Sequence, residues 1–219
     1  MKIVSFDFDL TITLGITGIE YVGDKISKGD PIREAIRLFL DARIDNNGFT
    51  DITAGLFRGE RRADICDVAR GIPIIKNLKE AIVLLQQEGY YCMINTLTYD
   101  FIVDPFMTIC GIPFCTGVQM NCDENGVLTG EIARYCSAQD KVSSVLALAK
   151  DRQEPLEQLI AIGDSAGDIP IFRQSNFGIA INSSSRDLLD IADAHIVTDD
   201  ALSIVREIIK LNKNIRYYA

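Results

Sequence analysis

The sequence has no excess of basic residues, no closely spaced cysteine pair and no long apolar run. Its 31 acidic residues outnumber the 22 basic ones, giving a formal net charge of -9, so the basic surface that nucleic-acid binding usually needs is missing. No apolar stretch approaches the length of a membrane span. We therefore expect neither a nucleic-acid nor a membrane partner. We also expect neither a secretory leader nor a transit peptide, because the chain starts directly with a strand-like run that ends in acids.

The cysteines and the histidine carry little functional signal. The six cysteines include no CxxC pair, and several fall inside apolar runs, where free cysteine behaves as a small hydrophobic residue. A reduced, cytoplasmic protein is the simplest interpretation. The single histidine, His195, lies in the segment Ala192-Asp-Ala-His-Ile-Val197. We expect this residue in a strand far from the chemistry rather than in the role of a base.

Apolar strand-like runs alternate with helical patterns along most of the chain, which is typical of a doubly wound parallel α/β sheet with helices on both faces. With 219 residues, of which 47% are hydrophobic, the chain can bury one large core and carry a modest insertion. The predicted strands are residues 2–6, 90–95, 159–163, 178–182 and 194–197, and the predicted helices are residues 78–88, 99–110, 139–150 and 201–211.

Two segments interrupt this alternation. Residues 14–72 contain no strand-like run and have the pattern of short helices, so we predict a helical cap domain of residues 14–72, inserted after the first strand of a core domain of residues 1–13 and 73–219. A smaller insertion lies near residues 115–134, where Asn125-Gly126 separates two strand-like runs. This dipeptide is a strong hairpin signal, and we expect a small ribbon beside the sheet.

The first predicted strand ends in Asp7 and Asp9, which are followed by the hydroxyl of Thr11. Side chains alternate along a strand, so the two carboxylates share one side of the backbone where the strand gives way to a loop. Two acids this close repel each other, unless a divalent cation lies against them or one is a nucleophile while the other carries a proton. Taken alone, the motif fits an acidic loop after an edge strand better.

Two further residues stand where a phosphate group would need them. Thr96 follows the run YYCMIN and is expected at the carboxyl end of a parallel strand, the edge where open sheets bind ligands. Its hydroxyl would either donate to a phosphate oxygen or cap the next helix, and both interpretations stay open. Lys141 is expected near a helix start, which already carries partial positive charge. This lysine either has an anion nearby or lies in solvent.

Residues 159–168 have the pattern of a buried strand that runs into a tight turn carrying Asp164 and Asp168. Either acid alone fits a turn or a helix cap. The strand ends together supply four acids and a hydroxyl, and a helix start supplies a lysine. That combination fits a metal ion and a phosphate group.

These motifs, in this order, resemble the haloacid dehalogenase superfamily of aspartate-nucleophile phosphatases, and most of all the archaeal type of its phosphoserine phosphatase-like branch. The resemblance rests on FDFDLT, on Thr96 after its strand, on Lys141 and on GDSAGD with the FGIAIN strand behind it. It implies a Rossmann-like α/β core with a helical cap. It also implies an enzyme that hydrolyses a small-molecule phosphate monoester with Mg²⁺ through an aspartyl-phosphate.

The resemblance implies a role for each motif residue. Asp7 would be the nucleophile, and Asp9 would protonate the leaving alcohol and then activate water. Mg²⁺ would be held by Asp7, by the backbone carbonyl of Asp9 and by Asp164, with Asp168 in support. The phosphoryl group would be bound by Thr96, Leu97 and Lys141. These roles are chemically sensible, because a carboxylate that attacks a phosphate monoester approaches an anion, whose charge a metal and a lysine must neutralise.

The sequence departs from the family pattern where the substrate binds. Two glycines usually follow the motif hydroxyl, whereas Leu97 and Thr98 do here, and Gly167 stands where an Asn is usual. The cap acid and arginine that grip the serine moiety in phosphoserine phosphatases have several candidates: Glu20, Arg58, Arg61, Arg62 and Arg70. The leaving alcohol therefore stays open, as does the oligomeric state.

Two other functions stay open as alternatives. A phosphoryl-receiver signalling domain also combines acids, a Thr and a Lys around Mg²⁺, but we would expect a shorter chain with no helical insertion after its first strand. A phosphotransferase or mutase would use the same aspartyl-phosphate and differ only in whether water or a second alcohol reaches the intermediate.

Overall fold

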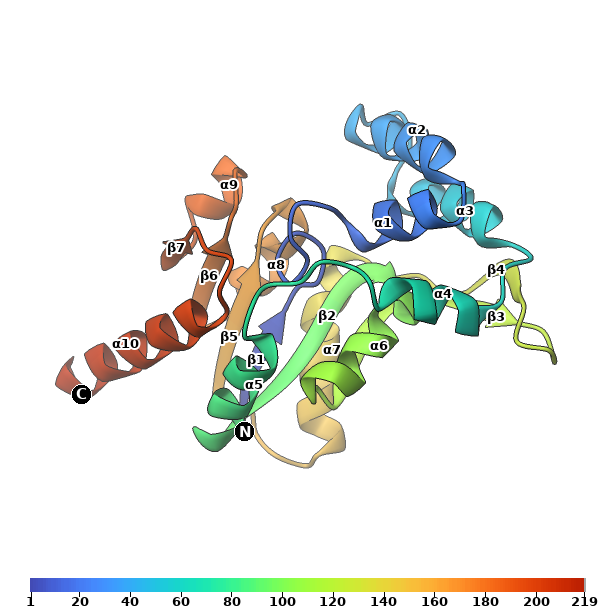
Figure 1. Ribbon diagram of the computed structural model, residues 1–219. Coiled ribbons are helices and arrows are strands. Elements are labelled where there is room, and N and C mark those ends of the chain that lie inside the picture. Colours follow the sequence, from blue (N-terminus) through green and yellow to red (C-terminus); the bar gives the residue numbers. More distant parts are fainter. Residues whose placement is uncertain (219) are drawn as a thin grey trace.

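A seven-stranded sheet of order β4-β3-β2-β1-β5-β6-β7 forms the centre of the computed structural model, which describes residues 1–218 and the side chains of residues 1–213 (Figure 1). Within this part of the chain, neighbouring strands pair in parallel except β3 and β4, which are antiparallel. The strands are β1 (Lys2–Phe6), β2 (Tyr90–Tyr99), β3 (Phe114–Cys122), β4 (Leu128–Arg134), β5 (Gln158–Gly163), β6 (Phe177–Ile181) and β7 (Ala194–Ile196).

Helices cover both faces of the sheet. Val4 of β1 packs in one buried cluster with Ile82, whereas Ile3 packs in a second cluster with Val145. Because successive strand residues face opposite sides, this central strand is buried on both faces of the sheet. The helices of the first face are α5 (Leu78–Gln87), α6 (Asp100–Cys110) and α10 (Leu202–Tyr218), and those of the second are α7 (Ala138–Asp151), α8 (Ile169–Phe172) and α9 (Arg186–Leu189). The predicted doubly wound α/β fold is confirmed.

The predicted strands are all present, with ends that differ by at most one residue except in β2. β2 continues past residue 95 to Tyr99, because β3 offers it a partner as far as the pair Tyr99↔Val118. Thr96 therefore lies within β2, and the prediction that it follows the strand is wrong in this detail. Thr96 does lie just beyond the last pair between β1 and β2, Phe6↔Ile94. His195 lies in β7, in a strand as predicted.

The prediction of a ribbon beside the sheet is wrong for its first strand. β3 pairs in parallel with β2, starting at Met93↔Phe114, and so belongs to the main sheet. The far end of β3 pairs with β4 across the turn at Asn125-Gly126, where Gly126 has a φ of 75°. The dipeptide located the turn correctly. A strand of 9 residues is long enough to pair with both β2 and β4. The local turn signal predicts the pairing with β4 but not the pairing with β2.

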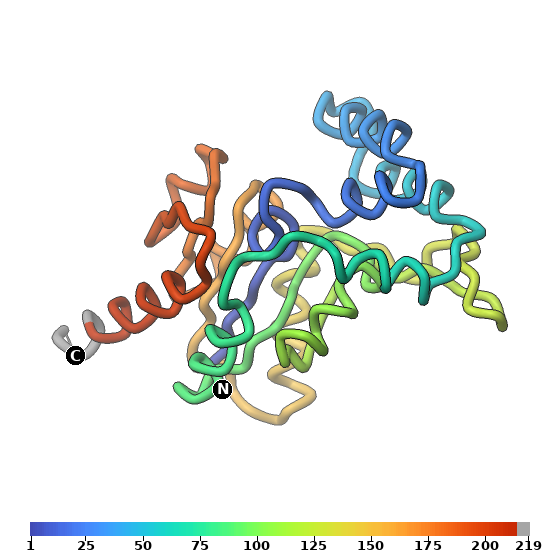
Figure 2. The backbone as a smooth tube through the Cα atoms, viewed as in Figure 1, coloured from blue at the N-terminus to red at the C-terminus, as the bar shows by residue number. Residues whose placement is uncertain are grey.

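Four helices stand between β1 and α5 in the chain, and Figures 1 and 2 show the first three projecting from the upper side of the molecule. Part of this insertion is bonded to the β3–β4 hairpin: the Gly59 amide donates to the Leu128 carbonyl, and the Leu128 amide donates to the Glu60 carbonyl. The Tyr99 hydroxyl also meets the Thr53 hydroxyl at 2.8 Å. The helices are α1 (Gly18–Lys25), α2 (Gly29–Leu40), α3 (Asn46–Phe57) and α4 (Arg62–Ala69).

None of the helices described within residues 1–218 has both the length and the apolar composition needed to cross a bilayer.

Candidate active site

Asp7 lies at the carboxyl end of the central strand β1. Its amide donates to the Ile162 carbonyl at 2.8 Å, so the backbone continues the pairing with β5 one residue past the strand. The Asp7 side chain is buried, with the residue 7% exposed. A parallel sheet brings the carboxyl ends of its strands to one edge, and here that edge carries an almost fully buried acid.

Lys141 lies beside Asp7 and is itself 2% exposed. Its ammonium donates to Asp7 Oδ1 at 2.6 Å and to Asp168 Oδ1 at 2.7 Å. The helix that carries it, α7, starts at a capping box in which the Ser137 hydroxyl accepts from the Asp140 amide and the Asp140 carboxylate accepts from Ser137. The sequence left open whether this lysine has an anion nearby or lies in solvent, and the structure places two carboxylates beside it.

The turn after β5 brings two more acids to the same place. Asp168 Oδ2 accepts from the backbone amides of Asp164 and Ser165, at 3.2 Å each, so the carboxylate closes its own turn. Gly163 permits this close approach, because a Cβ there would lie 2.2 Å from Asp168 Cγ. Carboxylate oxygens of Asp7, Asp164 and Asp168 all lie within 4.8 Å of one another.

One ammonium thus faces three carboxylates, and the electrostatics show the imbalance. Burial first, then the Asp168 charge, raises the pKa of Asp164 to about 7. Burial also raises the pKa of Asp7, although the Lys141 ammonium opposes that shift. For Lys141, burial lowers the pKa, but the charges of Asp168 and Asp7 outweigh it and the net direction is upward. The site therefore holds more negative charge than one lysine neutralises.

Asp9 is joined to the start of α1. Its Oδ1 accepts from the Gly18 amide at 2.6 Å, and a Cβ at position 18 would lie 3.3 Å from the same oxygen and 2.7 Å from Ile102. Burial raises the pKa of Asp9 to about 6, against the lowering effect of the Gly18 hydrogen bond, and the Glu20 charge adds to the rise. The chain turns directly after the two motif acids, at Leu10, which has a φ of 58°.

Thr96 and Leu97 lie on β2, next to this edge. The Thr96 hydroxyl accepts from the Thr98 amide at 3.2 Å. It does not cap α6, since the N-cap residue of that helix is Tyr99 and its side chain makes no capping bond. Leu97 reaches across to the turn after β5, because a Cβ on Gly167 would lie 3.4 Å from Leu97 Cδ1. Leu97 and Gly167, two positions at which the sequence departs from the family pattern, therefore lie against each other.

The cap candidates lie in different places. Glu20 stands near Asp9, on whose pKa its charge acts, and its carboxylate accepts from the Thr17 hydroxyl at 2.6 Å. Arg62 donates to Asp100 at 3.1 Å and to Asp104 at 2.5 Å, both on α6. The other arginines contact groups outside the acid cluster: Arg58 lies against Gly130, Arg61 forms a backbone bridge with Val127, and Arg70 pairs with Asp67.

The cluster fits a hard divalent cation. Carboxylate oxygens are the donors that Mg²⁺ prefers, and excess buried negative charge is what such an ion neutralises. Both oxygens of Asp168 already accept hydrogen bonds, from Lys141 and from the turn amides. Asp7 and Asp164 are therefore the acids better placed to ligate such a cation directly.

Two residues of this neighbourhood were not predicted from the sequence. The Gly18 amide that holds Asp9 lies in the insertion, and no local pattern connects it to Asp9. Asn95 is 1% exposed and bonds to the backbone of Lys141. A polar residue at the end of the apolar run YYCMIN was the signal that could have pointed to it.

A cavity lies away from the acid cluster. It measures about 620 Å³ and opens between α10 and the amino-terminal ends of the strands, beside Tyr90, Gln158 and Asn212. These three side chains bond to one another, at 2.9, 3.1 and 2.7 Å. Their polar groups are satisfied, and the acid cluster lies at the opposite edge of the sheet.

The fold and the site together define a doubly wound α/β domain with a buried carboxylate and lysine cluster at the carboxyl edge of its central strands. The model of the haloacid dehalogenase-like hydrolases matches residues 4–173. The chain belongs to that family.

Several curated proteins are similar to the chain at low identity. The phosphoserine phosphatase of Archaeoglobus fulgidus is 23% identical over 216 residues, and that of Campylobacter jejuni is 23% identical over 212 residues. The alignments cover 98% and 96% of this chain, and 62% and 99% of the two relatives. The chain spans only 47% of a phosphoserine phosphatase of Mycobacterium tuberculosis.

Solved structures show the same fold. A substrate-bound phosphoserine phosphatase complex has a TM-score of 0.76 at 20% identity, over 96% of this chain and 97% of that one. A haloacid dehalogenase family hydrolase from Salmonella enterica has a TM-score of 0.80 at 19% identity, over 89% of this chain and 66% of that one.

Proposed function

We propose that this chain is a Mg²⁺-dependent phosphatase that hydrolyses a small-molecule phosphate monoester through an aspartyl-phosphate on Asp7. The observation that carries the proposal is the contact of the Lys141 ammonium with Asp7 at 2.6 Å, within a cluster that also holds Asp164 and Asp168. A nucleophilic acid, a buried cation and further acids for a metal are the parts that phosphoryl transfer to a carboxylate needs.

In the first step, a carboxylate oxygen of Asp7 bonds to phosphorus as the bond from phosphorus to the leaving alcohol breaks. Two anions approach each other in this step, and Lys141 offsets their repulsion from a fixed, buried position. Because Asp168 and α7 already hold the lysine, its charge needs little rearrangement when the substrate arrives.

Asp9 serves as acid and then as base. Protonated, it donates its proton to the alcohol oxygen as that oxygen leaves; ionised, it takes a proton from the water whose oxygen then bonds to phosphorus and releases Asp7 and inorganic phosphate. A pKa of about 6 suits both roles, because both forms are populated near neutral pH. The hydrogen bond from Gly18 orients one Asp9 oxygen and leaves the other for the substrate.

Mg²⁺, when bound, would neutralise charge on the phosphoryl oxygens. Asp7, Asp164 and the backbone carbonyl of Asp9 would hold it, with Asp168 orienting the cluster.

The leaving alcohol is the open part of the proposal. The relatives named above make phosphoserine the first substrate to test. Leu97 and Gly167 alter the wall beside the acids, however, and Arg62 is paired with α6 rather than directed at Asp9. We propose that the cap, residues 14–72, sets this specificity, with Glu20 as the charged group near the leaving alcohol.

The direct test is phosphate release from a panel of monoesters, including phosphoserine, amino-alcohol phosphates, sugar phosphates and an aryl phosphate, with and without Mg²⁺. We expect Mg²⁺-dependent release from at least one, and none from the Asp7→Asn protein. Absence of release from every monoester by folded wild-type protein would exclude the proposal. Formation of a new phosphate ester when alcohol acceptors are added would replace hydrolysis by transfer.

Cap specificity is tested by alanine variants of the five cap candidates. Activity on a small aryl phosphate should persist, while at least Glu20→Ala should weaken use of the best monoester by about tenfold, the scale of one charge-assisted hydrogen bond. Wild-type behaviour of all five variants on that monoester would assign specificity to shape or to the loop at Leu97 and Thr98 instead.

A further inference from the structure

Asn95 is a polar residue in a buried strand, and its whole side chain is bonded. It is 1% exposed, between strand neighbours that are also buried. Its Nδ2 donates to the Lys141 carbonyl at 2.7 Å and to the Ser5 hydroxyl at 3.2 Å. Its Oδ1 accepts from the hydroxyls of Thr116, at 2.6 Å, and Ser144, at 3.1 Å. Burying an amide is costly without such partners, and at this position both polar atoms of the Asn95 side chain have them.

The orientation of the amide follows from its partners. A backbone carbonyl only accepts, so the group that meets the Lys141 carbonyl must be the NH₂ of Asn95. The remaining Oδ1 then accepts from Thr116 and Ser144, whose hydroxyls can rotate to donate. Only the bond to Lys141 requires the amide nitrogen.

These bonds connect three neighbouring strands to the helix that carries the lysine. Ser5 lies on β1, Thr116 on β3 and Lys141 in the first turns of α7. Asn95 also directly precedes Thr96 in β2. One side chain therefore bonds the backbone of Lys141 to the sheet whose edge carries Asp7.

We propose that Asn95 is a positioning residue that holds the Lys141 ammonium against Asp7 by fixing the Lys141 backbone to the sheet. The proposal rests on the proposed function, in which Lys141 neutralises the transferring phosphoryl group. Asn95 touches neither substrate nor metal. Its loss releases the start of α7, and the lysine then offsets charge at Asp7 less well.

The test is Asn95→Leu, which keeps the branched shape and removes every hydrogen bond. The matched control is Thr116→Val, which removes one hydrogen bond from the same network and leaves the bond to Lys141 in place. In this control, Asn95 Oδ1 keeps its hydrogen bond from the Ser144 hydroxyl.

The measurements are kcat and KM on an aryl phosphate with Mg²⁺, the inhibition constant of inorganic phosphate, and the thermal midpoint. For Asn95→Leu we expect kcat to fall and the phosphate inhibition constant to rise, each by about tenfold. Thr116→Val should keep both values within about twofold while its thermal midpoint falls. If Asn95→Leu does not fold, Asn95→Ser, whose hydroxyl is too short for the Lys141 carbonyl, takes its place with the same expected losses.

Unchanged kcat and phosphate inhibition in the Asn95 variant, despite a lower midpoint, would reduce Asn95 to a structural residue and overturn the proposal. Equal losses in both variants would overturn it too. If wild-type protein releases no phosphate, the proposed function fails. The crystal structure of Asn95→Leu then tests whether Asn95 positions Lys141. A distance from Lys141 Nζ to Asp7 Oδ1 lengthened from 2.6 Å to beyond about 3.5 Å supports the positioning role. An unchanged distance contradicts it.

Discussion

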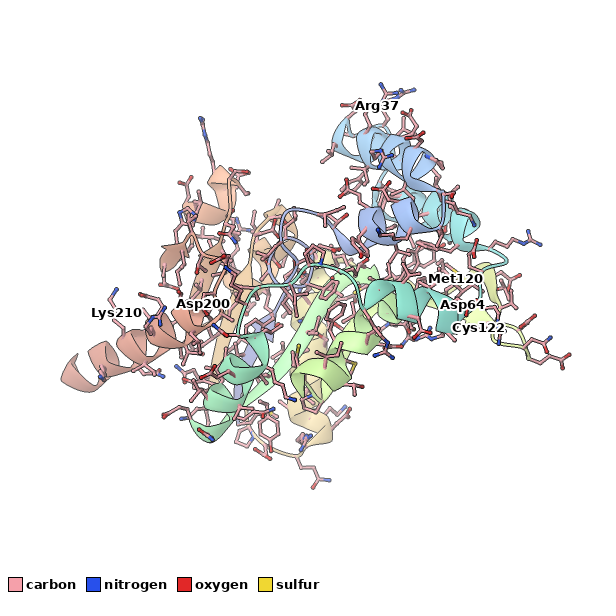
Figure 3. All side chains as sticks on the ribbon, in the orientation of Figure 1. Arg37, Asp64, Met120, Cys122, Asp200 and Lys210 are labelled. Carbon is pink, nitrogen blue, oxygen red and sulfur yellow. The ribbon has the colours of Figure 1, made fainter. Side chains whose placement is uncertain are left out.

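The carboxyl edge of the sheet and α2 both pair basic with acidic side chains, but in opposite surroundings. Lys141 is 2% exposed and contacts acids from two other elements. Arg37, labelled at the outer end of α2 in Figure 3, pairs at 2.8 Å with Glu34 on its own helix, and their side chains are 65% and 52% exposed. Arg62 is intermediate, at 29% exposed, and joins the insertion to α6.

This contrast shows that the distance between two charged groups does not by itself tell how much the ion pair contributes to stability or function. The three pairs have similar distances. An exposed pair is screened by water and contributes about 0–1 kcal/mol, whereas removing one member of a buried cluster leaves uncompensated charge. A buried cluster of charges costs folding stability. A catalytic site retains such a cluster because its chemistry needs charged groups with shifted pKa values. Five predictions test the contrast.

The largest effect should come from Asp7→Asn. The amide is not a nucleophile and removes one metal donor, so kcat should fall by about 10⁴-fold or more. Phosphate release measures this, and an unchanged circular dichroism spectrum is the control for folding. More than trace Mg²⁺-dependent activity in the folded variant would refute the nucleophile assignment.

Lys141→Met should follow. Loss of the buried charge that opposes the two anions should lower kcat by about 10²–10³-fold. The control is Lys150→Met, an exposed lysine on the same helix, which should keep wild-type kinetics. Equal kinetics in the two variants would make the buried lysine no more important than a surface one.

Asp9→Asn should impair the alcohol-leaving step and the water step. With alkyl phosphates the first step should slow by about 10²-fold, and with aryl phosphates by much less, because a good leaving group needs no proton. Burst kinetics separate the two steps. Equal slowing of the first step for both substrates would remove the acid role.

The metal-free protein should lose stability as pH rises. The pKa values of Asp9 and Asp164 are raised to about 6 and about 7 by burial, against about 3.9 for unfolded Asp. A raised acid pKa means that the folded state binds protons more tightly, so this stabilisation is present below about pH 4 and is lost through pH 6 to 7.

We therefore expect the chelator-treated protein to lose on the order of 2 kcal/mol of unfolding free energy between pH 5 and pH 8, measured by urea titration. Mg²⁺ should restore more stability at pH 8 than at pH 5. Asp164→Asn should flatten the pH dependence, and a steeper dependence in that variant would contradict this electrostatic account.

The smallest effects concern the insertion. Arg62→Met should lower the unfolding free energy by about 1–2 kcal/mol, because it leaves half-buried Asp100 without its partner. Arg37→Met should change it by less than about 0.5 kcal/mol. Neither should alter kcat on an aryl phosphate. Equal destabilisation by the two changes would mean that burial does not distinguish these pairs.

The sequence by itself determined the fold class and the members of the acid cluster. Apolar runs and helical patterns are local, and they located the predicted strands within one residue except in β2. Acids that follow buried parallel strands must meet, because the carboxyl ends of those strands share one edge. Asp7 and Asp164 could therefore be placed together without coordinates. The roles assigned to them stay predictions.

Only the tertiary structure decided which partners these groups take. No local pattern reports that Lys141 lies between Asp7 and Asp168, that Gly18 holds Asp9, or that Asn95 bonds the lysine backbone. For the same reason, the sequence predicts neither the place of β3 in the main sheet nor the pairing of Arg62 with α6. Contacts between distant segments depend on how whole elements pack to bury apolar surface, and the side chains brought together by that packing can lie more than a hundred residues apart in the chain.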